Sequence, residues 1–120
     1  MLFKKAIVRT PAPSVINGID DYADQGKPDY QTALQEHKDY VKLLTKLGVD
    51  VTVLDPLPDY PDSCFVEDPA VIFDDFAVIT NPARDSRHYE RELIKPAIKK
   101  FYQDKQIFEI KSPGTMEGGD

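Results

Sequence analysis

Two helical patterns, each followed by a short strand pattern, limit most strongly how this chain can fold. Apolar side chains recur every three or four residues over 30–47 and again over 89–101. Short apolar segments follow these patterns at 49–53 and 107–110. Helices that alternate with short strands predict an α/β fold, and a helix-strand pair that occurs twice indicates a repeat architecture such as a propeller.

Capping residues predict where the helices begin and end. Asp29 is placed to cap the first helix, and Gly48 is placed to end it. Ser86 is the expected cap of the second helix, and Pro96 should kink that helix because proline lacks a backbone donor. Both helices are expected to be amphipathic, with one apolar stripe each.

Three further apolar segments are predicted strands. Residues 6–8 form the first, and residues 70–73 and 76–80 form a hairpin across the two-residue link Asp74-Asp75. Residues 17–27 carry two glycines and little periodicity. A loop of that length is expected to be a functional lid or disordered.

Composition narrows the possible functions. The 120 residues suffice for one domain with a core but are few for two, so residues 1–120 are expected to belong to a single domain. A net charge of −6 opposes binding to nucleic acid or to an anionic membrane, and favours a cationic small molecule. Cys64 is the only cysteine, and no export signal or apolar run of roughly 20 residues is present, so a cytoplasmic location is expected.

Acidic side chains are concentrated directly before one of the predicted strands. Asp62, Glu67 and Asp68 lie within one short segment, and the apolar residues 70–73 follow it. Carboxylates beside a buried strand lose hydration, which is costly unless a cation compensates their charge. A cationic ligand would do so, and these residue types are also common in solvated turns. Glu117 repeats the position of Glu67 fifty residues later.

Other reactive residue types have ordinary structural explanations. Cys64, between Phe65 and Val66, is typical of a small buried side chain rather than of a nucleophile. His37 lies on the apolar stripe of the first helix and is expected to be structural, and His88 is expected at the surface. The acids lack the spacing of a Ca²⁺ loop, and no cluster of cysteine and histidine occurs, so neither a metal nor a cofactor is expected.

Four segments of the chain form a distinctive set in a fixed order. They are Gly26-Lys27-Pro28-Asp29-Tyr30 with Gln35, Glu36, His37 and Tyr40, then Pro61 to Asp68, then Asn81 to Arg87, and finally Met116-Glu117-Gly118-Gly119-Asp120. In this order they resemble the dimethylarginine dimethylaminohydrolases, a family of the guanidine-modifying superfamily that also contains arginine deiminases and amidinotransferases. The resemblance extends over nearly the whole chain, and the first segment favours the dimethylarginine branch.

The resemblance implies a fold and a chemistry. The family's fold is a five-bladed α/β propeller of ββαβ units, of which this chain would hold about two. Its reaction is attack by a cysteine thiolate on the guanidine carbon of methylated arginine, followed by hydrolysis of the thiouronium to citrulline. Planar cationic guanidinium groups suit binding by paired carboxylates.

The resemblance also assigns roles to particular residues. Asp62, Glu67 and Asp68 resemble the family's substrate-binding acids. Arg87 resembles the arginine that holds the substrate's α-carboxylate, although on its own it is equally typical of a surface arginine in the first turn of a helix. Glu117 resembles the acid that accompanies the catalytic histidine. Ile19 resembles the apolar residue of the lid.

The family's nucleophilic cysteine and catalytic histidine have no match in this chain. The resemblance therefore implies an amino-terminal part of a longer protein, inactive alone, whose partner is the remaining carboxy-terminal half. Apolar faces meant for a neighbouring unit would be exposed, so a homo-oligomer is a further expected partner. Two alternatives stay open: an arginine deiminase or amidinotransferase relative, and a non-catalytic acidic module that binds a cationic ligand.

Overall fold

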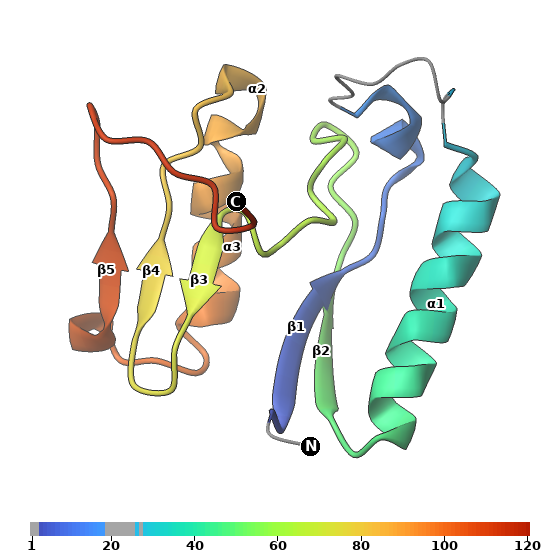
Figure 1. Ribbon diagram of the computed structural model, residues 1–120, viewed down its shortest axis with the longest axis horizontal. Coiled ribbons are helices and arrows are strands. Elements are labelled where there is room, and N and C mark those ends of the chain that lie inside the picture. The colour runs from blue at the N-terminus through green and yellow to red at the C-terminus, as the bar shows by residue number, and fades with distance from the viewer. Residues whose placement is uncertain (1–2, 19–25, 27) are drawn as a thin grey trace. The chain divides into compact units, whose positions relative to one another are not determined.

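The computed structural model describes residues 3–18, 26 and 28–120. The chain divides into two compact units, Met1–Cys64 and Phe65–Asp120 (Figure 1). Each unit has its own small sheet and its own helices. The expectation that residues 1–120 belong to a single domain stays a prediction.

The first unit is a βαβ arrangement with a parallel pair of strands. Strand β1 (Lys5–Arg9) pairs with β2 (Asp50–Leu54) in a register that sets Lys5 opposite Asp50 and Arg9 opposite Leu54. Between them lie the 3-10 helix η1 (Pro13–Asn17) and the long helix α1 (Tyr30–Lys46), which packs against β2. The sequence did not predict η1, because its proline-rich start reads as a turn.

Helix α1 begins and ends where its sequence predicts. The Asp29 side chain accepts hydrogen bonds from the backbone nitrogen of Thr32 at 2.9 Å and from its hydroxyl at 2.7 Å. Gly48 follows the helix with a φ of 90°, a conformation that only glycine adopts without cost. The predicted apolar stripe is the less exposed face of the helix, and it is half-buried at Tyr30, Ala33, Leu34, His37, Val41 and Leu44.

The second unit is a ββαβ arrangement. Strand β3 (Ala70–Ile72) pairs antiparallel with β4 (Ala77–Ile79), and β4 pairs parallel with β5 (Ile107–Glu109). The predicted hairpin is confirmed, since the backbone nitrogen of Phe73 donates to the carbonyl of Phe76 at 2.9 Å across the link. Helices α2 (Asp85–His88) and α3 (Glu90–Ile98) and the 3-10 helix η3 (Asp104–Gln106) connect β4 to β5.

Packing of α3 on β4 makes the core of this unit. Ala77 and Ile79 of the strand are fully buried, and Ile94, Ala97 and Ile98 of the helix are at most 5% exposed. Figure 1 shows α3 behind the sheet. The period of the helical pattern therefore identified the buried face correctly from Ile94 onward.

The bounds predicted for the second helix are wrong at both ends. The helical segment is interrupted at Tyr89, which is 57% exposed, and α3 ends at Ile98 rather than at Phe101. Arg84 rather than Ser86 occupies the cap position, and no side chain closes that end. Pro96 lies inside α3, and a helical hydrogen bond from the backbone nitrogen of Lys99 to the carbonyl of Lys95 spans it at 2.9 Å. The expected kink stays a prediction.

None of the helices among the described residues is long and apolar enough to cross a membrane.

Replacing Asp29 tests the start of α1. Hydrogen bonds from the side chain and the backbone nitrogen of Thr32 lower the pKa of Asp29. Because this pKa is lower in the folded protein, the stabilisation is present above the ordinary pKa of aspartate and is lost as pH falls through the lowered value. We expect Asp29→Ala in the complete gene product to accelerate amide hydrogen exchange at Thr32 several-fold at neutral pH.

Asp29→Asn is the matched control, because asparagine keeps the acceptor and removes the titration. We expect protection at Thr32 to survive in this variant and to lose its dependence on acidic pH. Unchanged exchange at Thr32 in Asp29→Ala would show that the cap contributes nothing to the helix.

Candidate functional site

Loops from three strands gather at one end of the sheet in the second unit. The parallel strands β4 and β5 both end there, and the antiparallel strand β3 begins there (Figure 1). In open α/β sheets, ligands bind outside the carboxyl ends of the parallel strands. Glu67 and Asp68 precede β3, Arg87 follows β4, and Glu117 follows β5, so these predicted site residues all lie at this end.

The carboxylate of Asp68 is held at both oxygens. Oδ2 accepts from Arg87 at 2.5 Å, and Oδ1 accepts from the backbone nitrogen of Gly119 at 3.1 Å. The backbone carbonyl of Asp68 accepts from the nitrogen of Gly118 at 2.9 Å and from the hydroxyl of Thr80 at 2.6 Å. These bonds come from three different segments, so the orientation of Asp68 depends on the folding of the whole second unit.

Arg87 is buried and bonded mainly to carboxylates. Glu90 accepts from Nε at 2.9 Å and from NH2 at 2.8 Å, while Asp68 accepts from NH1. NH2 also donates to the carbonyl of Phe65 at 3.4 Å. Burial by itself would lower the pKa of Arg87, but its hydrogen bonds to the carboxylates of Glu90 and Asp68 outweigh burial and raise that pKa. Arg87 is therefore a permanent, oriented cation.

Glu117 is held by the loop that follows β4. Its Oε1 accepts from the backbone nitrogen of Ala83 at 2.7 Å. One residue earlier, the nitrogen of Met116 donates to the carbonyl of Asn81 at 2.8 Å, and the Asn81 side chain donates to the carbonyl of Gly114 at 2.6 Å. Asn81 is 2% exposed, so its hydrogen bonds hold the segment that carries Glu117 from a buried position.

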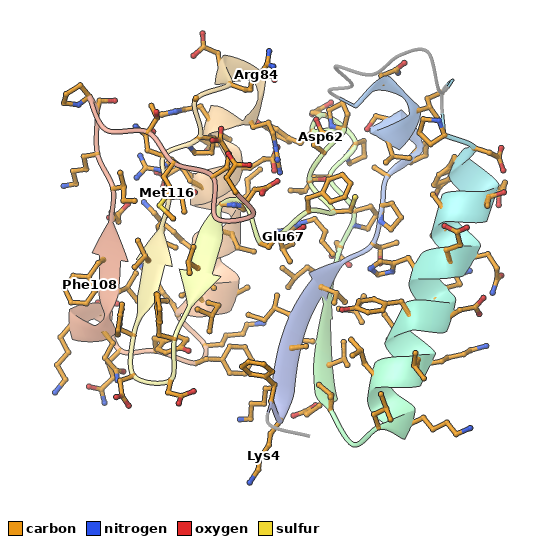
Figure 2. The ribbon with its side chains drawn as sticks, in the orientation of Figure 1. Lys4, Asp62, Glu67, Arg84, Phe108 and Met116 are labelled. Carbon is orange, nitrogen blue, oxygen red and sulfur yellow. The ribbon has the colours of Figure 1, made fainter. Side chains whose placement is uncertain are left out.

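Gly118 and Gly119 allow this segment to lie against the acidic stretch. A Cβ on Gly118 would lie 2.2 Å from the carbonyl oxygen of Glu67, and one on Gly119 would lie 2.4 Å from Oδ1 of Asp68. No side chain fits at either distance. The glycine pair therefore brings the backbone of residues 117–119 into contact with Glu67 and Asp68, and Figure 2 labels Glu67 and Met116 at this end of the unit.

Asp62 belongs to the first unit, where it also follows the carboxyl ends of a parallel pair of strands (Figure 2). Asp62 is 9% exposed, and a Cβ on Gly18 would lie 2.5 Å from Oδ1 of Asp62. The turn at Gly18 thus lies directly against this carboxylate. Ile19, the predicted lid residue, lies outside the described residues.

Two histidines and one cysteine are the other residues with reactive side chains. His37 is half-buried on α1, and burial lowers its pKa. Cys64 is half-buried in the first unit, and His88 is exposed at the end of α2, as expected. Within the part of the chain that the structure describes, no three histidine, cysteine, aspartate or glutamate side chains are grouped to hold a metal ion.

Sequence reasoning missed two residues of this site. Glu90 reads as an exposed acid of a first helical turn, and the only signal for its pairing is its spacing of three residues from Arg87. Asn81 reads as a loop residue before a proline. Its role follows from burial, which the sequence does not display.

A family profile described as N,N dimethylarginine dimethylhydrolase, eukaryotic, matches residues 7–119. The chain belongs to the dimethylarginine dimethylaminohydrolase family. A relative of this name from Pseudomonas aeruginosa is 43% identical over 119 residues, which are 99% of this chain and 46% of that protein. Another from Streptomyces coelicolor is 36% identical over 98% of this chain and 45% of that protein. The chain thus spans about half the length of these relatives.

Solved structures agree with the family assignment and give the fold. A mutant dimethylarginine dimethylaminohydrolase from Pseudomonas aeruginosa, complexed with citrulline, matches with a TM-score of 0.94 and 42% identity over all of this chain and 46% of that one. An adduct of the enzyme with S-methyl-L-thiocitrulline matches 99% of this chain and 46% of that one, with a TM-score of 0.92 and 42% identity. The N-terminal domain of ArgZ, an arginine dihydrolase of cyanobacteria, matches 97% of this chain and 42% of that one, with a TM-score of 0.80 and 13% identity. At this identity the match shows a shared fold alone.

Two expectations from the sequence are thereby confirmed. The chain corresponds to the amino-terminal portion of the dimethylarginine dimethylaminohydrolases. Its fold is the matching part of the α/β propeller that they share with more distant amidinotransferase-superfamily proteins.

Replacing Gly118 tests the close contact beneath the acidic loop. We expect Gly118→Ala in the complete gene product to lower the free energy of unfolding by about 1–3 kcal/mol, because its Cβ must push the backbone of Glu67 away. Gly114→Ala is the control from the same loop, since its Cβ would meet nothing closer than 3.3 Å. Urea unfolding followed by circular dichroism measures both, and equal midpoints would contradict the inferred contact.

Proposed function

We propose that the complete gene product converts dimethylarginine to citrulline and dimethylamine through a cysteine-thiouronium intermediate. This chain supplies acidic residues that bind the guanidinium, and the nucleophile lies outside it. Membership of the family, together with a set of oriented acids at the carboxyl ends of the strands, carries the proposal. Relatives solved with citrulline and with S-methyl-L-thiocitrulline support this class of ligand.

Asp68 and Glu67 are the proposed guanidinium partners in the second unit. A carboxylate offers about four acceptor positions, and Arg87 and Gly119 occupy one on each oxygen of Asp68. The remaining positions suit the N–H groups of a forked, planar cation. Because Asp68 is fixed by protein donors before any ligand binds, it can set the plane of the guanidinium for the attacking sulfur.

The reaction proceeds in two steps. The cysteine thiolate attacks the guanidinium carbon and forms a C–S bond, and the C–N bond to dimethylamine breaks as the amine leaves with a proton. Water then adds to the same carbon, the C–S bond breaks, and citrulline and the thiolate are released. Glu117 is proposed to accompany the histidine that moves these protons, in keeping with its fixed bond to Ala83.

Three other residues keep the roles that the resemblance assigns them. Asp62 is proposed to bind substrate from the first unit, and Ile19 to contribute an apolar contact from the lid. Arg87 as the partner of the substrate's α-carboxylate stays a prediction. Its bonds with Glu90 and Asp68 support a second role, which is to hold the carboxylate of Asp68 in place.

Asp68→Asn tests the proposal in the complete gene product. Asparagine keeps the size of the side chain and removes its charge, so the guanidinium loses a charged partner. We expect kcat/KM for dimethylarginine to fall by about 100-fold or more, because losing one partner of such a pair costs about 2–5 kcal/mol. Citrulline release measures the rate, and circular dichroism checks that the fold is retained.

Asp75→Asn is the matched control, since Asp75 lies in the exposed β3–β4 link. It should leave citrulline release unchanged. Undiminished turnover in Asp68→Asn would contradict the role assigned to this acid. If the unaltered protein turns over arginine but not dimethylarginine, an arginine deiminase is favoured instead. Binding of cations without any turnover would favour a non-catalytic module.

A further inference from the structure

Glu90 takes no part in the reaction steps, yet it is only 4% exposed. Burying a carboxylate is unfavourable unless it is paired and hydrogen-bonded, and Glu90 meets this condition through two hydrogen bonds from Arg87. An exposed first-turn acid would stabilise the helix without being buried. The burial of Glu90 therefore calls for an explanation that involves Arg87.

The two bonds to Glu90 fix the plane of the Arg87 guanidinium. Glu90 engages Nε and NH2, which form one edge of the fork, so NH1 on the other side is directed at Oδ2 of Asp68. A bidentate pair of this kind sets direction as well as energy. Glu90 thus determines, through Arg87, where the carboxylate of Asp68 points.

Glu90 also changes the charge balance around Asp68. Arg87 carries one positive charge and contacts two carboxylates, so Asp68, Arg87 and Glu90 together carry a net charge of about −1 at neutral pH. Without Glu90, Arg87 and Asp68 would form a neutral pair. A neutral pair attracts a cation far less than a pair with an additional negative charge beside it.

We propose that Glu90 is a positioning residue that keeps the charge of Asp68 available to a cationic substrate by occupying the guanidinium of Arg87. This inference rests on the proposed function, because it concerns how the same site selects a guanidinium. The expected consequence is selectivity: the site should distinguish a guanidinium from the neutral ureido group of citrulline partly through Glu90.

Glu90→Gln in the complete gene product tests this selectivity. The readout is the ratio of the inhibition constant of citrulline to the KM of dimethylarginine, because both molecules carry the same amino-acid end and differ in charge at the other end. We expect the ratio to fall about tenfold, because the KM of the cationic dimethylarginine rises while the inhibition constant of neutral citrulline changes little. A merely structural defect would weaken both ligands alike and leave the ratio unchanged, which would overturn the inference.

A double variant, Arg87→Gln with Glu90→Gln, provides an independent test. It removes both charges of the buried pair and leaves Asp68 charged, but without the Arg87 donor that orients it. We expect a ratio above that of Glu90→Gln, because Asp68 no longer shares its charge with Arg87, and below that of the unaltered protein, because the orientation of Asp68 is lost. If Glu90→Gln does not fold, the comparison with the unaltered protein remains, since a buried neutral pair avoids an unpaired charge. A ratio equal to that of the unaltered protein, or no higher than that of Glu90→Gln, contradicts the inference.

The unaltered protein separates failure of the inference from failure of the proposed function. If it does not release citrulline from dimethylarginine, the proposed function and the inference that rests on it are both wrong. If it does, and the ratio is insensitive to Glu90, only the inference is wrong.

Discussion

The hydrogen bonds that converge on Asp68 are the constraint on which the acidic site depends. They bring together the segment before β3, the helical segment after β4 and the glycine pair after β5. Each of these segments is a loop or a helix end, and none would hold a carboxylate in one orientation by itself. The short three-stranded sheet supplies the frame, and Asp68 joins the loops that this frame brings to one end.

Much of the fold follows from local signals in the sequence. Asp29 and Gly48 act through their own backbone and nearest neighbours, so the sequence alone locates both ends of α1. The second helix was predicted less well because Tyr89 and Phe101 fit the spacing of a buried stripe, although both side chains are exposed. Periodicity identifies a buried face, whereas helix ends depend on local backbone bonding.

The candidate site was predictable only in part, for a different reason. Composition and resemblance identified the acids, because their types and spacing are visible in the sequence. Glu90 and Asn81 could not be found in this way, since their roles arise from burial and from bonds to residues that lie elsewhere in the unit. The glycine pair was visible, but the contact that requires it joins backbone segments 51 positions apart.

The separation between bonded residues also has a consequence for how the site forms during folding. Arg87 and Glu90 are three positions apart and can pair as soon as their helical segment forms. The bond between Gly119 and Asp68 spans 51 positions, so it must wait until the chain has passed through α3 and β5 and closed a long loop. The ion pair is therefore local in sequence, whereas the orientation of the Asp68 carboxylate depends on closing a loop of 51 positions.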